Sequence, residues 1–234
     1  MKNIVLLVCD QFPGILTPDI PNYESMFINV FQKAGYTGGF QVLQTWKGEL
    51  PAQLSEDDVY LITGSQASAY DDTAWVKNLL EWIGKAFHQG ARLTGICFGH
   101  QAIAQALGGR VVASPKGWDV GLRPSLMKDE LGRVLLRDNG FSLVYNHHDL
   151  VARLPHAAAC VSGSECCAID SFRIGRQVVT LQGHPEFTTP FIRHWIEDCA
   201  PDEPERVKED ALDSLSQGKN DGVRMAEFLL DFFA

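Results

Sequence analysis

The segment Thr94–Gln101, which reads TGICFGHQ, decides the fold of this chain. It follows an apolar lead-in, and residues 102–107 (AIAQAL) behind it are good helix formers. We therefore expect Cys97 at a sharp turn from a buried strand into a helix, where Gly95 and Gly99 leave room for the backbone. This is the geometry of a nucleophile elbow, with sulfur in place of oxygen. Unpaired amides at the helix start would favour the thiolate over the thiol.

The composition is that of an ordinary globular protein. Of the 234 residues, 45% are hydrophobic and 21% are charged, so residues 1–234 are interpreted as a single domain with a sizeable core. The net charge of −9 argues against nucleic acid as a partner, because phosphate binding requires a basic face. No apolar run is long enough to cross a membrane. The six cysteines include no C-x-x-C pair, which indicates reduced thiols and a cytoplasmic location.

The first half of the chain alternates strands and helices, which is the signature of a parallel sheet covered on both faces. Ligands gather at the carboxyl ends of such strands, so Gly64, which follows one of them, is expected beside Cys97. Apolar runs and periodic apolar faces predict, in order, a strand over residues 3–9, a helix capped by Asn22, strands over 39–46 and 59–62, a helix over 75–87 and the strand into Cys97.

From Arg110 to residue 181 the pattern changes to short strands with short, helix-poor links, which favours antiparallel pairing. Helices return at Thr188, and residues 203–234 are expected to form a C-terminal helical extension with a strongly apolar last helix. The predicted fold class is therefore α/β: a single domain with a mixed, mostly parallel central sheet, flanked by helices and carrying a small antiparallel portion.

A second motif, His184-Pro185-Glu186, follows another strand. Pro185 keeps His184 out of helical geometry. A histidine near a thiol can take its proton, and a carboxylate beyond the histidine can hold its tautomer and stabilise the imidazolium. In isolation the motif describes an ordinary surface turn. With the Cys97 elbow earlier in the chain, it is interpreted as the partner of the thiol.

Gly95, Cys97, Gly99 and Gln101, followed by the motif 184–186, resemble the class I (triad) glutamine amidotransferase domain. The resemblance covers nearly the whole chain and implies that family's flavodoxin-like mixed sheet. It also implies a Cys-His-Glu triad that attacks the side-chain amide of glutamine, forms a γ-glutamyl thioester and releases ammonia without a cofactor.

Residue roles follow from the resemblance. Cys97 would be the nucleophile, His184 the general base and Glu186 the orienting carboxylate. The oxyanion hole would be made by the backbone amides of Gly64 and Phe98, each contributing roughly 3 kcal/mol to the transition state. Substrate contacts are implied for Gln101, Asn146, His148 and Asp149.

No metal site is expected. His147 and His148 are adjacent on a strand, so their side chains point to opposite faces and chelate poorly. His100 is close to Cys97 in sequence, but on the first turn of the helix it should face elsewhere. The remaining cysteines are interpreted as core or bystander thiols: Cys9, Cys160, Cys166, Cys167 and Cys199.

Two positions depart from the common family pattern. Thr63–Ser65 contains one glycine where many amidotransferases have two in succession, and His148 stands where glycine is common. Both departures resemble the free-standing subgroup that includes γ-glutamyl peptidases.

Three hypotheses therefore compete. The chain is an amidotransferase subunit that supplies ammonia to a synthetase partner, a stand-alone hydrolase or peptidase of small γ-glutamyl compounds, or a non-catalytic scaffold. The lack of a G-x-x-x-x-G-K phosphate loop argues against a complete synthetase. The intact Cys97, His184 and Glu186 argue against a scaffold.

Overall fold

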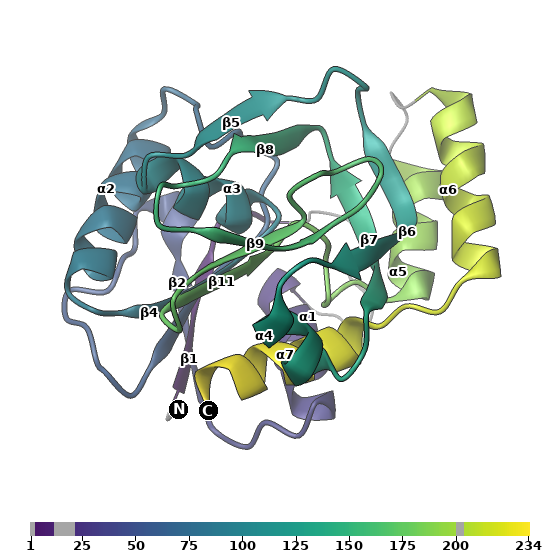
Figure 1. Ribbon diagram of the computed structural model, residues 1–234. Coiled ribbons are helices and arrows are strands. Elements are labelled where there is room, and N and C mark those ends of the chain that lie inside the picture. The colour runs from purple at the N-terminus through teal and green to yellow at the C-terminus, as the bar shows by residue number, and fades with distance from the viewer. Residues whose placement is uncertain (1–2, 12–21, 200–203) are drawn as a thin grey trace.

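The computed structural model describes residues 3–11, 22–199 and 204–234. Within these ranges, nine strands form one sheet and two more form a small antiparallel pair (Figure 1). The spatial order of the large sheet is β2 (Gly39–Gln44), β1 (Asn3–Val8), β3 (Val59–Ile62), β4 (Arg92–Ile96), β11 (Val178–Leu181), β10 (Ser171–Ile174), β9 (Ala159–Gly163), β6 (Asp119–Met127) and β7 (Gly140–His147). The small pair is β5 (Arg110–Ala113) and β8 (Asp149–Arg153).

The large sheet is mixed, which confirms the predicted fold class. Neighbouring strands run parallel from β2 to β11. From β11 to β7 each neighbour runs antiparallel to the last. After these four reversals β7 points the same way as β4 and β11. The carboxyl ends of β3, β4, β11 and β7 therefore lie at one edge of the sheet.

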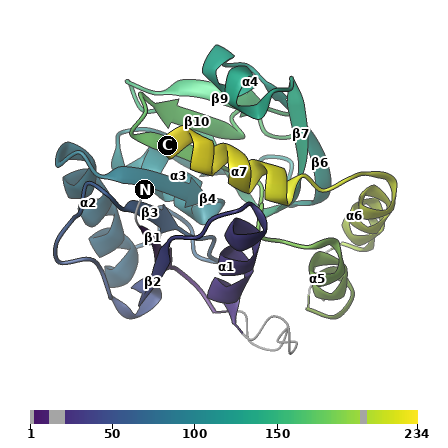
Figure 2. The ribbon, with the colours of Figure 1, turned by 90° about the horizontal axis from the view of Figure 1, so that it is seen from below.

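Helices cover both faces of the sheet. The core has two parts, one on each face of the sheet, and the side chains of β1 point alternately into them. Ile4, Leu6 and Val8 pack with α1 and α7, whereas Val5 and Leu7 pack with α2 and α3. Figure 2 shows α7 beside α1. The helices are α1 (Tyr23–Lys33), α2 (Ala74–His88), α3 (Phe98–Ala106), α4 (Glu130–Leu136), α5 (Thr189–His194), α6 (Glu205–Gln217) and α7 (Gly222–Phe233).

Local signals explain several boundaries. The side chain of Asn22 accepts a hydrogen bond from the backbone N–H of Ser25 (3.0 Å), so the predicted helix cap is confirmed. The strand predicted over 39–46 ends at Gln44, because Thr45–Lys47 form a 3-10 turn.

The expectation of helix-poor links after Arg110 was wrong at one place. Residues Glu130–Leu136 form α4, whose first turn is capped by Asp129 through the N–H of Gly132 (3.0 Å). Strand β8, which begins at Asp149, was also not predicted. It pairs with β5 and not with the large sheet.

The C-terminal helices pack onto the body of the domain. α6 contacts β6, and α7 contacts α1, α4 and β7. The guanidinium of Arg92 also donates to the carbonyl of Phe233 (3.1 Å), which ties the end of α7 to the start of β4. In the described ranges, none of the helices has the length and apolar character needed to cross a membrane.

Candidate active site

Cys97 lies at the carboxyl end of β4, directly before α3. Its backbone has φ 52° and ψ −105°, a conformation that non-glycine residues rarely adopt. A Cβ at Gly95 would overlap the backbone of Gly99, and a Cβ at Gly99 would overlap the carbonyl oxygen of Ile62. The sharp turn predicted at Cys97 is therefore present, and close backbone packing explains both glycines.

His184 follows β11 and pairs with Glu186. Its Nδ1 lies 2.7 Å from Oε1 of Glu186, and both side chains are buried. Two contacts fix the imidazole: the backbone N–H of His184 donates to the carbonyl of Val144 (2.8 Å), and the ring stacks face to face on Phe187 at 4.0 Å. Nε2 is buried and has no hydrogen-bond partner among the described residues.

The backbone at Gly64 borders both the thiol and the imidazole. A Cβ built at Gly64 would lie 3.0 Å from Cε1 of His184 and 3.7 Å from the Cβ of Cys97. Phe98 opens α3, so its amide has no partner within the helix. The structure thus brings together the five residues that the sequence assigned to the reaction centre.

Charged neighbours at the site raise the pKa of His184. Burial lowers the pKa of His184, but the negative charges of Glu186 and Cys97 together outweigh that effect and raise the pKa to about 10. These two neighbours favour the protonated form of the imidazole.

Tyr23 is part of this site although its spacing on α1 indicated only core packing. Its hydroxyl donates to Oε1 of Glu186 (3.2 Å), the same oxygen that His184 contacts. The feature of the sequence that could have indicated this contact is the tyrosine hydroxyl, because a buried tyrosine usually needs a hydrogen-bond partner.

The residues predicted to contact the substrate form a connected group that reaches Cys97. The carbonyl of Asn146 is 3.9 Å from the sulfur of Cys97, and Oδ1 of Asn146 is buried without a partner among the described residues. Both amide hydrogens of Gln101 are engaged, since Nε2 donates to the carbonyl of Asp149 (2.9 Å) and to Oε1 of Gln182 (3.1 Å). The side chain of His148 is 41% exposed and lies beside Trp118.

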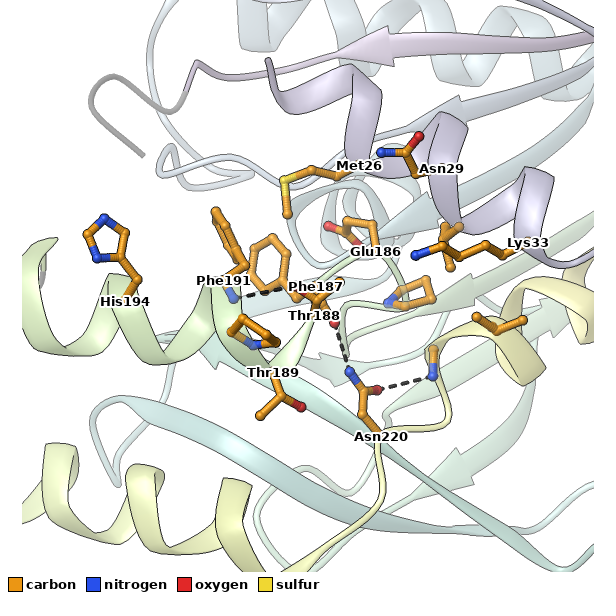
Figure 3. A pocket seen from close by; sticks show the side chains of 15 residues that line it. Met26, Asn29, Lys33, Glu186, Phe187, Thr188, Thr189, Phe191, His194 and Asn220 are labelled. Atoms are coloured by element: carbon orange, nitrogen blue, oxygen red, sulfur yellow. Dashed lines mark hydrogen bonds between the residues drawn. The ribbon is translucent and has the colours of Figure 1, made fainter. Parts of the chain in front are cut away.

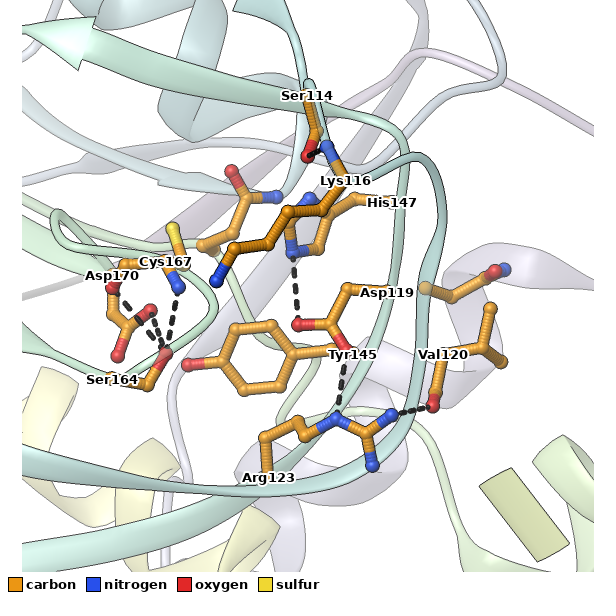
Figure 4. Close-up of polar contacts among 12 residues, drawn as sticks. Ser114, Lys116, Asp119, Val120, Arg123, Tyr145, His147, Ser164, Cys167 and Asp170 are labelled. Atoms are coloured by element: carbon orange, nitrogen blue, oxygen red, sulfur yellow. Dashed lines mark hydrogen bonds and ion pairs between the residues drawn. The ribbon is translucent and has the colours of Figure 1, made fainter. Parts of the chain in front are cut away.

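His147 belongs to a polar network that the sequence did not reveal (Figure 4). Nδ1 of His147 is 2.9 Å from the carbonyl of Asp149, and its Nε2 points to Asp119 at 3.9 Å. Asp119 in turn accepts from Nε of Arg123 (2.7 Å). His147 is buried and His148 is not, so the two side chains point to opposite faces as predicted.

His100 faces away from Cys97. It is fully buried against Thr180, 2.7 Å from its hydroxyl, and burial lowers its pKa to about 3. His100 is therefore a neutral core histidine. Across the described ranges, no three His, Cys, Asp or Glu side chains are grouped to hold a metal ion. The side chain of Cys199 lies outside the described part of the chain.

A cavity of about 650 Å³ is lined in part by Glu186 (Figure 3). α1 contributes Met26 and Lys33 to it, the segment after His184 contributes Phe187 and Phe191, and the start of α7 contributes Val223. The cavity therefore touches the residues that hold the imidazole but not Cys97 itself.

Comparison with known proteins identifies the family. A family model described as glutamine amidotransferase class-I matches residues 20–200, and the chain belongs to that family. Gamma-glutamyl peptidase 3 of Arabidopsis thaliana is 32% identical over 192 residues, which is 79% of this chain and 76% of that protein. The glutamine-hydrolyzing GMP synthase of Chlorobaculum tepidum is 34% identical over 132 residues, covering 54% of this chain but 25% of that enzyme.

Solved structures support the same fold. A glutamine amidotransferase from Thermotoga maritima superposes with a TM-score of 0.76 over 100% of this chain and 99% of that one, at 21% sequence identity. At this identity the likeness concerns the fold alone. Helices α6 and α7 lie beyond the residues that the family model matches.

Proposed function

We propose that this protein hydrolyses a γ-glutamyl amide bond through a covalent thioester on Cys97. The observation that carries the proposal is the position of Cys97, on a strained turn beside the buried His184–Glu186 pair. This conformation and the two closely packed glycines support a role for Cys97 in nucleophilic attack and not in packing.

The proposed reaction has two halves. The thiolate of Cys97 attacks the γ-carbonyl carbon of the substrate, His184 gives its proton to the departing nitrogen, and ammonia or an amine leaves. Water then attacks the thioester and His184 accepts a proton from that water. The C–S bond breaks, which releases glutamate and returns Cys97 to the thiolate. Glu186 stabilises the imidazolium throughout. No cofactor is required.

Two backbone amides would stabilise the oxyanion that forms in each half. The amide of Phe98 follows the nucleophile, and the amide of Gly64 lies on the adjoining loop. Each is assigned roughly 3 kcal/mol of transition-state stabilisation. The glutamyl end of the substrate is assigned to Asn146 and His148. The side-chain amide of Gln101 and the carboxylate of Asp149 already bind groups of the protein itself.

Two versions of this activity are in competition. Similarity to the Arabidopsis γ-glutamyl peptidase and the departures at Ser65 and His148 favour a stand-alone hydrolase of γ-glutamyl compounds. Similarity to part of GMP synthase favours a subunit that supplies ammonia to a synthetase partner.

Because the described cysteines are free thiols, we place the protein in a reducing compartment, the cytoplasm.

Steady-state kinetics with the purified chain test the proposal. Glutamine, γ-glutamylcysteine and γ-glutamylglycine would be compared for Cys97→Ala, His184→Ala and the wild type. Cys97→Ala should lower kcat by at least about 10³-fold. The matched control is Cys166→Ala, which removes an exposed cysteine and should leave kcat unchanged. Undiminished hydrolysis by Cys97→Ala would refute the proposal. Activity that needs an added partner extract would favour the synthetase version.

A further inference from the structure

The carboxylate of Asp149 is already occupied by the protein. Oδ2 accepts a hydrogen bond from the hydroxyl of Ser68 (2.6 Å), and Oδ1 accepts one from the hydroxyl of Tyr70 (2.9 Å). Nδ1 of His148 also lies 3.3 Å from Oδ1. An ionised carboxylate has about four acceptor positions, so three contacts leave little capacity for a substrate.

The two hydroxyl donors belong to the loop that begins at Gly64. The other end of this loop is held by a second carboxylate, because the backbone N–H of Gln66 donates to Oδ2 of Asp10 (2.7 Å). Within the loop, Asp71 accepts from the backbone N–H of Ser68 (2.9 Å). The segment from Gln66 to Tyr70 is thus fastened at both ends, close to the backbone proposed as an oxyanion donor.

The backbone of Asp149 is fixed just as firmly on the other side. Its carbonyl accepts from Nε2 of Gln101 on α3 (2.9 Å) and lies 2.9 Å from Nδ1 of His147. The end of β7, three residues earlier in the chain, brings the carbonyl of Asn146 to 3.9 Å from the sulfur of Cys97. Asp149 therefore connects the elements that carry the nucleophile to the loop that follows Gly64.

We propose that Asp149 is a positioning residue whose carboxylate holds the loop of residues 65–71, and with it the Gly64 amide, in register with Cys97. The inference rests on the proposed function, since it assigns a purpose to the Gly64 amide in that reaction. A positioning residue and a direct substrate contact affect different steps of the reaction. Asp149 would govern stabilisation of the transition state, with little effect on ground-state binding.

The test separates kcat from KM. Asp149→Ala should lower kcat about 10- to 100-fold for a γ-glutamyl substrate and change KM by no more than about twofold. Asp149→Asn retains one acceptor oxygen and should give an intermediate kcat. A rise in KM with unchanged kcat would overturn the inference and indicate a direct substrate contact.

A double-mutant cycle with Tyr70→Phe identifies the interaction. Tyr70 is 48% exposed, so removing its hydroxyl should leave the fold intact. Tyr70→Phe should lower kcat in the wild type and have no further effect in Asp149→Ala. Equal effects in both backgrounds would contradict the inference. If Asp149→Ala fails to fold, Asp149→Asn replaces it in the cycle, and loss of kcat in the singles Tyr70→Phe and Ser68→Ala supports the same conclusion.

Two controls complete the design. Asp72→Asn alters an 89% exposed carboxylate just beyond the loop and should have no effect on kcat. Cys97→Ala distinguishes the two claims: if it stays active, the proposed function fails. If it is inactive while Asp149→Ala keeps full kcat, only the positioning role fails.

Discussion

The position of Cys97 depends on the close approach of two backbone segments, one at Gly99 and one at Ile62. Gly99 packs so closely on the carbonyl of Ile62 that any Cβ there overlaps it. Gly99→Ala should therefore lower the free energy of unfolding by roughly 3 kcal/mol or more, because backbone atoms have no rotamer by which to yield. Urea denaturation measures this effect.

Gly84→Ala is the matched control. Gly84 lies inside α2, and a Cβ there meets no atom within 4 Å. Alanine should stabilise that helix by about 0.5–1 kcal/mol. Equal effects of the two substitutions would contradict the close packing at the elbow.

Tyr23 supports the carboxylate that orients His184. Tyr23→Phe removes one donor to the buried Oε1 of Glu186 and should lower the free energy of unfolding by roughly 1.5–3 kcal/mol. A decrease of about tenfold in kcat/KM, equivalent to about 1.4 kcal/mol, should accompany it. Tyr36→Phe, whose hydroxyl donates to the carbonyl of Gly39 far from the site, should keep full activity. Full activity of Tyr23→Phe would show that the hydroxyl of Tyr23 does not contribute to the reaction.

At the scale of elements, α7 is bound to the domain mainly by apolar side chains. Phe228 is buried among residues of the core, so Phe228→Ala should lower the free energy of unfolding by roughly 3–5 kcal/mol. Glu227→Ala, one residue away on the exposed side, should change it by less than about 0.5 kcal/mol. Equal effects measured by thermal denaturation would show that α7 does not pack as described.

The parallel half of the fold could be predicted because its signals are local. Apolar runs and helix periodicity marked β1, α1, β3, α2 and β4, and the glycines around Cys97 marked the elbow. The helix α4 was missed because it is short, although Asp129 is a good cap. The pairing of β8 with β5 depends on contacts across the fold, which periodicity does not encode.

The grouping of the candidate site residues was predicted in the same way, from two motifs with a recognisable chemistry. The structure brings Cys97, His184 and Glu186 together as the sequence suggested. The hydroxyl of Tyr23 and the anchoring of Asp149 could not be predicted. Both depend on partners more than 70 positions away in the chain, and a hydroxyl or carboxylate does not specify its partner in sequence.

For the whole molecule, a buried carboxylate makes stability depend on pH. Burial raises the pKa of Asp170 to about 6, despite hydrogen bonds from Ser125 and others that lower it. The folded protein thus keeps a proton that the unfolded chain has lost, and this contribution to stability is complete below about pH 4 and lost as the pH rises through about 6.

Asp170→Asn should remove that dependence. The free energy of unfolding of the variant, relative to wild type, should rise by roughly 3 kcal/mol between pH 4 and pH 7. Urea denaturation at each pH measures the difference. If the free energies of unfolding of the two proteins changed in parallel with pH, the raised pKa of Asp170 in the folded protein would be contradicted.

The central claim, that Cys97 is the γ-glutamyl acceptor, is tested most directly by covalent labelling. The protein is incubated with 6-diazo-5-oxo-norleucine, a glutamine-shaped electrophile, and the site of attachment is mapped by peptide mass spectrometry. We predict one label, on Cys97, that is slowed by added γ-glutamyl substrate and absent from Cys97→Ser. Labelling at another residue such as the exposed Cys166, or labelling that persists in Cys97→Ser, would contradict the account.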